Sequence, residues 1–308
     1  MIEKELAIIG GGIAGCSVSL YTKRFGLDFF LFEEKIIGGQ LFLIEKIENY
    51  PGIEEIKGYE FAKRLEKMIE DLGIEVKKEK VIKLEIKEKE ILLYSDKERY
   101  LFKGLIVATG SSFKKLKVKG EEEFLGKGVS FCAVCDGFFF KDRTVCVVGG
   151  GNTACEEAFY LSQITNKVFL IHRRDKLRAV DYLQKKIFKK NNIEVLFNKT
   201  VKEIKGKQNV EEVILEDVET KELSSLKLSA VFVAIGTKPN TEFLKGIVSL
   251  DEKGFIFTNE EMQTSLEFIW ACGDCRRRPL RQLITSASEG AISAISAYKH
   301  LKGQYISS

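Results

Sequence analysis

The sequence predicts an α/β fold with two Rossmann-like, three-layer dinucleotide-binding domains, because a β-α-β pattern with a glycine-rich loop occurs twice. The first copy begins with the apolar run Leu6–Ile9, which leads directly into Gly10–Gly12. The second begins with Thr144–Val148, which leads into Gly149–Gly151. A continuous apolar run is typical of a strand that is buried on both faces of a parallel sheet. Glycines after such a strand let the backbone approach a pyrophosphate at the N-terminus of the next helix.

The other elements of the first copy follow from the spacing of apolar residues. A helix is expected from Ala14 to Phe25, followed by a second buried strand at Phe29–Phe32. Residues 58–72 have the spacing of an amphipathic helix. Short alternating strands are expected between residues 81 and 102, and the apolar run 105–108 predicts another buried strand.

The second copy repeats this order. The expected elements after its glycine loop are a helix at 153–161, a strand at 168–171 and short strands near Val195, Val213 and 231–234. The tail of the chain then resumes with a strand at 268–271 and a helix at about 280–301. Both copies end on similar turns, Val107–Gly110 and Val233–Gly236, so the repeat has the size of a whole domain. Linkers are expected near 111–119 and 236–243.

Composition and charge narrow the class of protein. The chain has 308 residues, 44% of them hydrophobic, which is enough for two globular domains. Its net charge is only +4, with acidic and basic residues interspersed, so nucleic acid is not expected as the main partner. No signal peptide or membrane span is expected. The seven cysteines mostly lie in apolar segments, which favours a reducing compartment and therefore the cytoplasm.

The first glycine loop has the spacing of a dinucleotide fingerprint. Gly10, Gly12 and Gly15 form G-x-G-x-x-G between a predicted strand and a predicted helix. Glu33 ends the next strand, where an acidic side chain would hydrogen-bond ribose hydroxyls. The strand, loop, helix and acid together are a much more specific signal of a dinucleotide site than the glycines alone.

The second loop has a different charge near it. Gly149, Gly151 and Ala154 repeat the fingerprint with alanine in the third position. The next strand ends at His172-Arg173-Arg174, with Arg178 slightly later, and no acid takes the ribose position. Arginines at this place suit a 2′-phosphate, so NADP(H) is favoured over NAD(H). His172 itself is expected to be structural.

Two cysteines just before the second loop form a C-x-x-C pair. Cys132 and Cys135 can open and close a disulfide, and a nearby dinucleotide site can supply the electrons. Asp136 could handle the thiol proton or cap a turn, and the acid/base role is favoured. Cys272 and Cys275 have the same spacing more than a hundred residues later, but a shared metal site or a second redox pair is not favoured.

A further cofactor contact is expected after the strand at 268–271. Ionised Asp274, preceded by Gly273, could accept a hydrogen bond from a ribitol-type hydroxyl. Arg281 and Gln282 open the C-terminal helix, and backbone amides near Gln282 could face a flavin ring.

Together these motifs resemble the bacterial low-molecular-weight thioredoxin reductases, a class of pyridine nucleotide-disulfide oxidoreductases that use FAD and NADPH. The matching segments are Gly10–Gly15, Gly38–Leu41, Glu48–Gly52, Ala108–Gly110, Cys132–Gly137, Gly149–Ala154, His172–Asp175, Gly236, Pro239–Asn240, Gly273–Asp274 and Arg281–Gln282. They extend over nearly the whole chain, so the joint match is very specific.

The resemblance implies an organisation and a set of roles. FAD would bind a discontinuous domain of residues 1–114 and 244–308, and NADPH an inserted domain of residues 115–243 that carries the dithiol. Cys135 would face the flavin, Cys132 would attack the disulfide of thioredoxin, and Asp136 would donate the proton. A homodimer is also implied. The implied cofactor contacts are Gly10, Gly12, Ile13, Ala14, Gly15, Glu33, Gly39, Gln40, Leu41, Asn49, Ala108, Thr109, Gly110, Gly273, Asp274, Arg281 and Gln282 for FAD, and Gly149, Gly151, Asn152, Thr153, Ala154, His172, Arg173, Arg174, Arg178 and Gly236 for NADPH.

The chain departs from the family pattern at two places. Leu283 follows the Arg-Gln pair where the family commonly has alanine, which puts the packing near the flavin ring in doubt. The basic run Cys275–Pro279 could help to dock a partner, but a solvated loop is the favoured interpretation. Other acceptors, such as a glutaredoxin-like or peroxiredoxin-linked carrier, and a non-enzymatic flavin-binding redox sensor are the alternative functions. The arginines near the second loop argue against the sensor.

Overall fold

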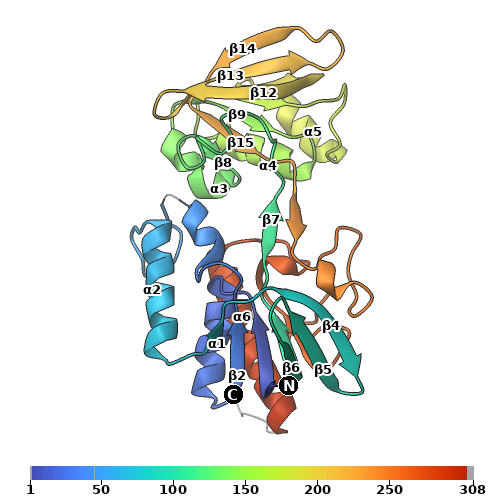
Figure 1. Cartoon of the computed structure of the whole chain (residues 1–308). Helices are drawn as coiled ribbons and strands as arrows, with labels where there is room; N and C mark the ends of the chain where they lie inside the picture. The colour runs from blue at the N-terminus through green and yellow to red at the C-terminus, as the bar shows by residue number, and fades with distance from the viewer. Residues whose placement is uncertain (1, 45, 304–308) are drawn as a thin grey trace. The chain divides into compact units, whose positions relative to one another are not determined.

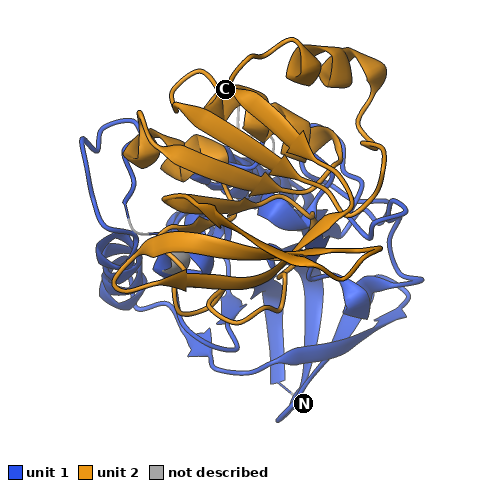
Figure 2. Cartoon of the chain, turned by 90° about the horizontal axis from the view of Figure 1, so that it is seen from above, with its two compact units in different colours: residues 1–112, 238–308 blue, residues 113–237 orange. Residues whose placement is uncertain are grey.

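The computed structural model describes residues 2–44 and 46–303, and the chain divides into two compact units. Figure 1 shows the elements and Figure 2 colours the units. Unit 1 contains residues 1–112 and 238–308, and unit 2 contains residues 113–237. Where the chain passes between them, the short strands β7 (Ser111–Phe113) and β16 (Thr237–Pro239) pair with each other.

Unit 1 is built on one sheet with the order β3-β2-β1-β6-β5-β4, and β17 also pairs with β6. The strands are β1 (Ile2–Ile9), β2 (Phe29–Phe32), β3 (Val76–Lys77), β4 (Val81–Lys87), β5 (Glu90–Ser95), β6 (Arg99–Val107) and β17 (Ile269–Ala271). Strands β1, β2, β3, β6 and β17 are parallel to their neighbours, whereas β4, β5 and β6 pair antiparallel. Residues 6–9 of β1 are buried on both faces, as a central parallel strand requires.

The two faces of this sheet are covered differently. Leu6 and Ile8 pack toward α1 (Ile13–Arg24), α2 (Gly58–Asp71) and α6 (Leu283–Lys302). Ala7 and Ile9 face a second core with aromatic side chains from β2 and β6. Helices α1 and α6 pack closely, because a Cβ on Gly290 would lie 2.5 Å from the carbonyl oxygen of Ala14. This close packing places the start of α6 beside the first glycine loop.

Unit 2 has three layers. Its parallel sheet has the order β11-β10-β9-β15-β8, and a three-stranded antiparallel sheet, β12-β13-β14, accompanies it. The strands are β8 (Val129–Ser130), β9 (Thr144–Val148), β10 (Lys167–Ile171), β11 (Ile193–Leu196), β12 (Lys199–Gly206), β13 (Val210–Asp217), β14 (Leu223–Lys227) and β15 (Ala230–Val233). Val145 and Val147 pack on the helical side, whereas Cys146 and Val148 pack against the antiparallel sheet.

The helices of unit 2 are α3 (Ala133–Asp136), α4 (Asn152–Leu161) and α5 (Asp181–Phe188). Short 3₁₀ helices complete the chain at Gly39–Leu43, Gly137–Phe140, Glu242–Leu244 and Gly273–Cys275. No helix within residues 2–44 and 46–303 has the length and apolarity that a membrane crossing requires. The predicted α/β fold with two Rossmann-like units is confirmed. The last helix begins at Leu283 rather than near 280, because Gln282 caps it.

Candidate functional site

The first glycine loop needs glycine at two positions for steric reasons. Gly10 has φ +107°, and a Cβ there would lie 2.4 Å from the carbonyl oxygen of Ala108. A Cβ on Gly15 would lie only 1.7 Å from the carbonyl oxygen of Gly10. Gly12, the N-cap residue of α1, differs from both, because a Cβ on it would have no atom within 4 Å. The loop is therefore tight on its protein side and open at Gly12, which is the form of a phosphate cradle at a helix N-terminus.

Glu33 stands at the end of β2, as the fingerprint predicts, and supports this loop directly. Its Oε2 accepts a hydrogen bond from the N–H of Gly11 at 2.7 Å, and its Oε1 accepts one from the N–H of Lys35 at 2.8 Å. A carboxylate has about four lone-pair sites, so each oxygen keeps acceptor capacity for a ribose hydroxyl. The side chains of Ala14, Leu41 and Ala108 are buried.

Polar side chains around this loop are held by other parts of unit 1. The amide of Gln40 donates to the carbonyl of Ser111. Asn49 donates from Nδ2 to Oε1 of Gln282 at 3.1 Å, which joins a loop before α2 to the cap of α6. Thr109 donates from Oγ1 to the carbonyl of Asn240 at 2.8 Å, beside Gly110 with φ +65°. The structure thus brings these predicted FAD contacts together within one unit.

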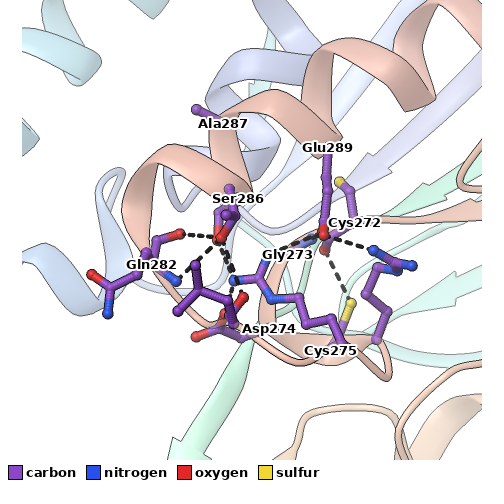
Figure 3. Close-up of polar contacts among 12 residues, drawn as sticks. Cys272, Gly273, Asp274, Cys275, Gln282, Ser286, Ala287 and Glu289 are labelled. Carbon is purple, nitrogen blue, oxygen red and sulfur yellow. Dashed lines mark hydrogen bonds and ion pairs between the residues drawn. The ribbon is translucent and has the colours of Figure 1, made fainter. Parts of the chain in front are cut away.

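The segment after β17 joins this group through Gly273. Gly273 has φ +76°, and its Cβ would lie 3.0 Å from the Cβ of Ala14. Its N–H donates to Oε2 of Glu289 at 2.8 Å, and Asp274 next to it forms an ion pair with Arg278 (Figure 3). The guanidinium of Arg281 lies 4.4 Å from the centre of the Phe255 ring, and burial lowers its pKa.

The basic run 275–279 is not the solvated loop that we expect from the sequence. The side chains of Arg276 and Arg278 are only 14% and 2% exposed, and both form ion pairs with Glu289. Only Arg277 of the three arginines is exposed, with its guanidinium 5.1 Å from the centre of the Phe257 ring. The expectation is wrong because the compensating acid, Glu289, lies more than ten residues away on α6. Sequence reasoning missed Glu289, which has no motif around it.

The second pair of cysteines is buried. Cys272 and Cys275 are free thiols with no solvent exposure. Burial raises the pKa of the Cys275 thiol to about 11 and raises that of Cys272 as well. Neither thiol is therefore poised to react as a thiolate.

The second glycine loop repeats the backbone of the first. A Cβ on Gly149 would lie 2.4 Å from the carbonyl oxygen of Ala234, and Gly151 is open within 4 Å. A Cβ on Gly150 would lie 2.3 Å from Nδ1 of His172, so the imidazole packs directly under the loop. Burial lowers the pKa of His172, and the charges of nearby arginines lower it further. A buried neutral histidine in this position supports the loop, as the structural interpretation predicts.

Three arginines close to this loop in the sequence have exposed guanidinium groups. Arg173, Arg174 and Arg178 are exposed, and none has an ion pair within the residues that the structure describes. The N–H of Arg178 donates to the carbonyl of Gly150 at 2.6 Å, which fixes its backbone beside the loop. Asn152 accepts from the N–H of Val180 at 3.0 Å and holds the same segment. Unpaired guanidinium groups here are suited to bind a phosphate.

Cys132 and Cys135 form a disulfide at the start of α3, with their Cα atoms 5.3 Å apart. The sulfur of Cys132 accepts a hydrogen bond from the N–H of Cys135 at 3.2 Å. Asp136 accepts a hydrogen bond of 2.5 Å from the hydroxyl of Ser130, and the same hydroxyl oxygen accepts the N–H of Cys132 at 3.0 Å. Asp136 makes no capping bond to the short helix at 137–140. Sequence reasoning missed Ser130, which links the acid to the dithiol.

The chain belongs to the pyridine nucleotide-disulphide oxidoreductases, because the model of that family matches residues 4–291. Several of its relatives are named thioredoxin reductases. It is 37% identical to the thioredoxin reductase of Peptoclostridium acidaminophilum, over 98% of each chain, and 40% identical to that of Bacillus subtilis, over 97% of this chain and 95% of that one. The crystal structure of thioredoxin reductase from Streptococcus pyogenes matches with a TM-score of 0.94 at 37% identity, over 98% of this chain and 99% of that one.

These likenesses show an oxidoreductase and a flavoprotein that uses FAD and NADPH. The residues present fit both groups. Two tight glycine loops are open at Gly12 and Gly151, and the second has exposed arginines beside it that form no ion pair among the described residues.

Proposed function

We propose that this protein is an NADPH-dependent thioredoxin-disulfide reductase. The observation that carries the proposal is the Cys132–Cys135 disulfide in the same unit as a glycine loop with free arginines. The reaction is NADPH + H⁺ + protein disulfide → NADP⁺ + protein dithiol. Two electrons leave the nicotinamide, and the thioredoxin disulfide is the bond that finally breaks.

FAD is assigned to residues 1–114 and 244–308, and NADPH to residues 115–243. Gly10, Gly12 and Glu33 support the first assignment, and Arg173 with Arg174 supports the second. Bound FAD supplies the two-electron relay between NADPH and the disulfide. The chain's own residues bind the two pyrophosphates, orient them at helix N-termini and present the disulfide.

Cys132 is the nucleophile of the proposed reaction. The N–H of Cys135, which already donates to its sulfur, stabilises the thiolate that attacks the disulfide of thioredoxin. Cys135 then attacks the mixed disulfide, so the second substrate thiol leaves and Cys132–Cys135 reforms. Asp136, held by Ser130, supplies the proton that the departing thiolate needs.

Two further features belong to the proposal. A homodimer is proposed on the resemblance, and sedimentation of the purified protein measures it. The cytoplasm is proposed because the reaction consumes NADPH and keeps thiols reduced.

The experiment is an NADPH-consumption assay with thioredoxin, a glutaredoxin-like protein and a small free disulfide as separate acceptors. Thioredoxin should be the fastest acceptor. The variant Cys132→Ser should keep NADPH-dependent bleaching of the flavin and lose thioredoxin turnover. Full turnover by that variant would sink the scheme, whereas a preference for another acceptor would change the substrate alone. A protein whose flavin NADPH does not bleach would favour the sensor.

A further inference from the structure

The loop between β17 and α6 buries two guanidinium groups in an ion-pair network. The side chain of Arg278 is 2% exposed and that of Arg276 is 14% exposed. A buried charge is strongly unfavourable unless paired carboxylates and hydrogen bonds compensate for its lost hydration. The groups that pair with the two guanidinium groups therefore show which parts of the structure the network holds in place.

Glu289 of α6 is the centre of the network. Its Oε1 accepts from Nη1 of Arg276 at 2.6 Å, and its Oε2 accepts from Nη1 of Arg278 at 3.0 Å. The same Oε2 accepts the N–H of Gly273 at 2.8 Å. One carboxylate therefore fixes both arginines and the backbone immediately before Asp274.

Arg278 extends the network from Glu289 to Asp274. Its Nη2 donates to Oδ1 of Asp274 and, at 2.8 Å, to the hydroxyl of Ser286 (Figure 3). Because a guanidinium is planar and its donors point in fixed directions, contacts at both ends restrict the orientation of the Asp274 carboxylate. A lysine at this place would supply charge without that planar fork.

The network lies beside the first glycine loop. Gly273 approaches Ala14 so closely that a Cβ on it would lie 3.0 Å from the Cβ of Ala14, and Ala14 is in the first turn of α1. Asp274, the residue after Gly273, is thus held close to the start of α1. Its Oδ2 has no hydrogen bond to any group of the described residues, so this oxygen remains an available acceptor.

We propose that Arg278 is a positioning residue for the flavin: it holds the Asp274 carboxylate so that the second oxygen accepts a hydroxyl of the bound dinucleotide. This inference rests on the proposed function in one respect, namely that FAD is the dinucleotide of unit 1. Arg278 acts through Asp274, with Glu289 as the buried counter-ion that keeps the guanidinium in place.

A purely structural role makes a different prediction. If Arg278 only stabilised the loop, its substitution would lower the melting temperature of the protein and weaken FAD binding by the same factor whether or not Asp274 is intact. If it positions Asp274, its effect on FAD affinity should largely disappear once the Asp274 carboxylate is removed.

The test measures the dissociation constant of FAD by flavin fluorescence, with full-length apoprotein, for wild type, R278K, D274N and R278K/D274N. R278K keeps a cation in the buried place, so the fold is retained, and the melting temperature of each apoprotein checks this. The matched control is R277K, which makes the same replacement at the exposed neighbour. We expect R278K to weaken FAD binding roughly tenfold, the usual size of a supporting-residue effect, and R277K to leave it unchanged.

Two outcomes would overturn the inference. One is an R278K protein that binds FAD as tightly as R277K does. The other is an equal loss from R278K in the wild-type and D274N backgrounds. Failure of the wild-type protein to bind FAD would instead contradict the proposed function, so the two failures are distinguishable.

Discussion

The two glycine loops have nearly the same backbone and different surroundings. In each, a Cβ on the first glycine would lie 2.4 Å from a carbonyl oxygen, that of Ala108 in unit 1 and that of Ala234 in unit 2. The middle glycine contacts the residue that directly follows the next strand in both units. That residue is Glu33 beside Gly11 in unit 1 and His172 beside Gly150 in unit 2.

The difference shows how one backbone can select two dinucleotides. In unit 1 the Glu33 carboxyl accepts a hydrogen bond from the loop, and an acidic side chain at this place is expected to favour ribose hydroxyls over a phosphate. In unit 2 a buried His172 with a lowered pKa fills the equivalent place, and the exposed Arg173 and Arg174 follow it. On the proposed assignment, the two loops share pyrophosphate binding, and the residues after the second strand of each unit distinguish the two dinucleotides.

The largest expected effect comes from adding a side chain to a tightly packed glycine of the first loop. Gly15→Ala places a Cβ against the backbone oxygen of Gly10, where no flexible side chain can give way. We expect a loss of about 3 kcal/mol in the free energy of unfolding, together with loss of bound FAD. Denaturant unfolding and flavin content measure the two effects. Gly12→Ala is the matched control, since its Cβ direction is open, and it should weaken FAD binding with little loss of stability. Equal stability of the two variants would refute the comparison.

A smaller effect is expected from the arginines of the second loop. Replacing Arg173 and Arg174 together with glutamine should lower kcat/KM for NADPH roughly 10- to 100-fold and leave that for NADH nearly unchanged, because each lost bond to a phosphate is charge-assisted. Steady-state kinetics with both nucleotides measure it. Lys176→Gln, an exposed cation in the same turn, is the control. A similar loss with NADH would show that the arginines do not read the 2′-phosphate.

The smallest effect concerns the helices that follow the loops. Val18 of α1 is fully buried, and Glu157 occupies the matching place in α4, six residues after the second glycine of the fingerprint. Burial raises the pKa of Glu157 from 4.5 to about 7, although the N–H of Ala133 opposes this. The charged neighbour that acts on it is Glu156. A carboxyl whose pKa is raised by folding stabilises the protein fully below its unfolded pKa, and this stability is lost as pH rises through its folded pKa.

We therefore expect wild-type stability to fall by on the order of 2 kcal/mol between about pH 4.5 and pH 7 through this group. Glu157→Gln should remove that slope, and the exposed Glu156→Gln should retain it. Urea unfolding at a series of pH values gives both slopes. If the two variants show the same slope, Glu157 is ionised in the folded protein.

Local patterns predict the loops and central strands well, and tertiary pairing explains what they miss. Residues 6–9 and 144–148 are continuous apolar runs before glycines, so their strands and loops are evident from the sequence. The burial of Arg278 is not, because its partner Glu289 lies on another element and a run of arginines ordinarily indicates solvent. Helices α3 and α5 are also missed, since both are too short to show a clear period. Ser130 shows its link to Asp136 only once β8 and α3 are in place.

The central claim is that electrons from NADPH open the Cys132–Cys135 disulfide. The most direct measurement is alkylation of the native, full-length protein with and without NADPH under anaerobic conditions, followed by mass spectrometry of the peptides. Cys132 and Cys135 should become modified only after NADPH is added, with NADH much less effective, while the buried Cys272 and Cys275 stay unmodified in both samples. The account is contradicted if NADPH leaves Cys132 and Cys135 as unreactive as before.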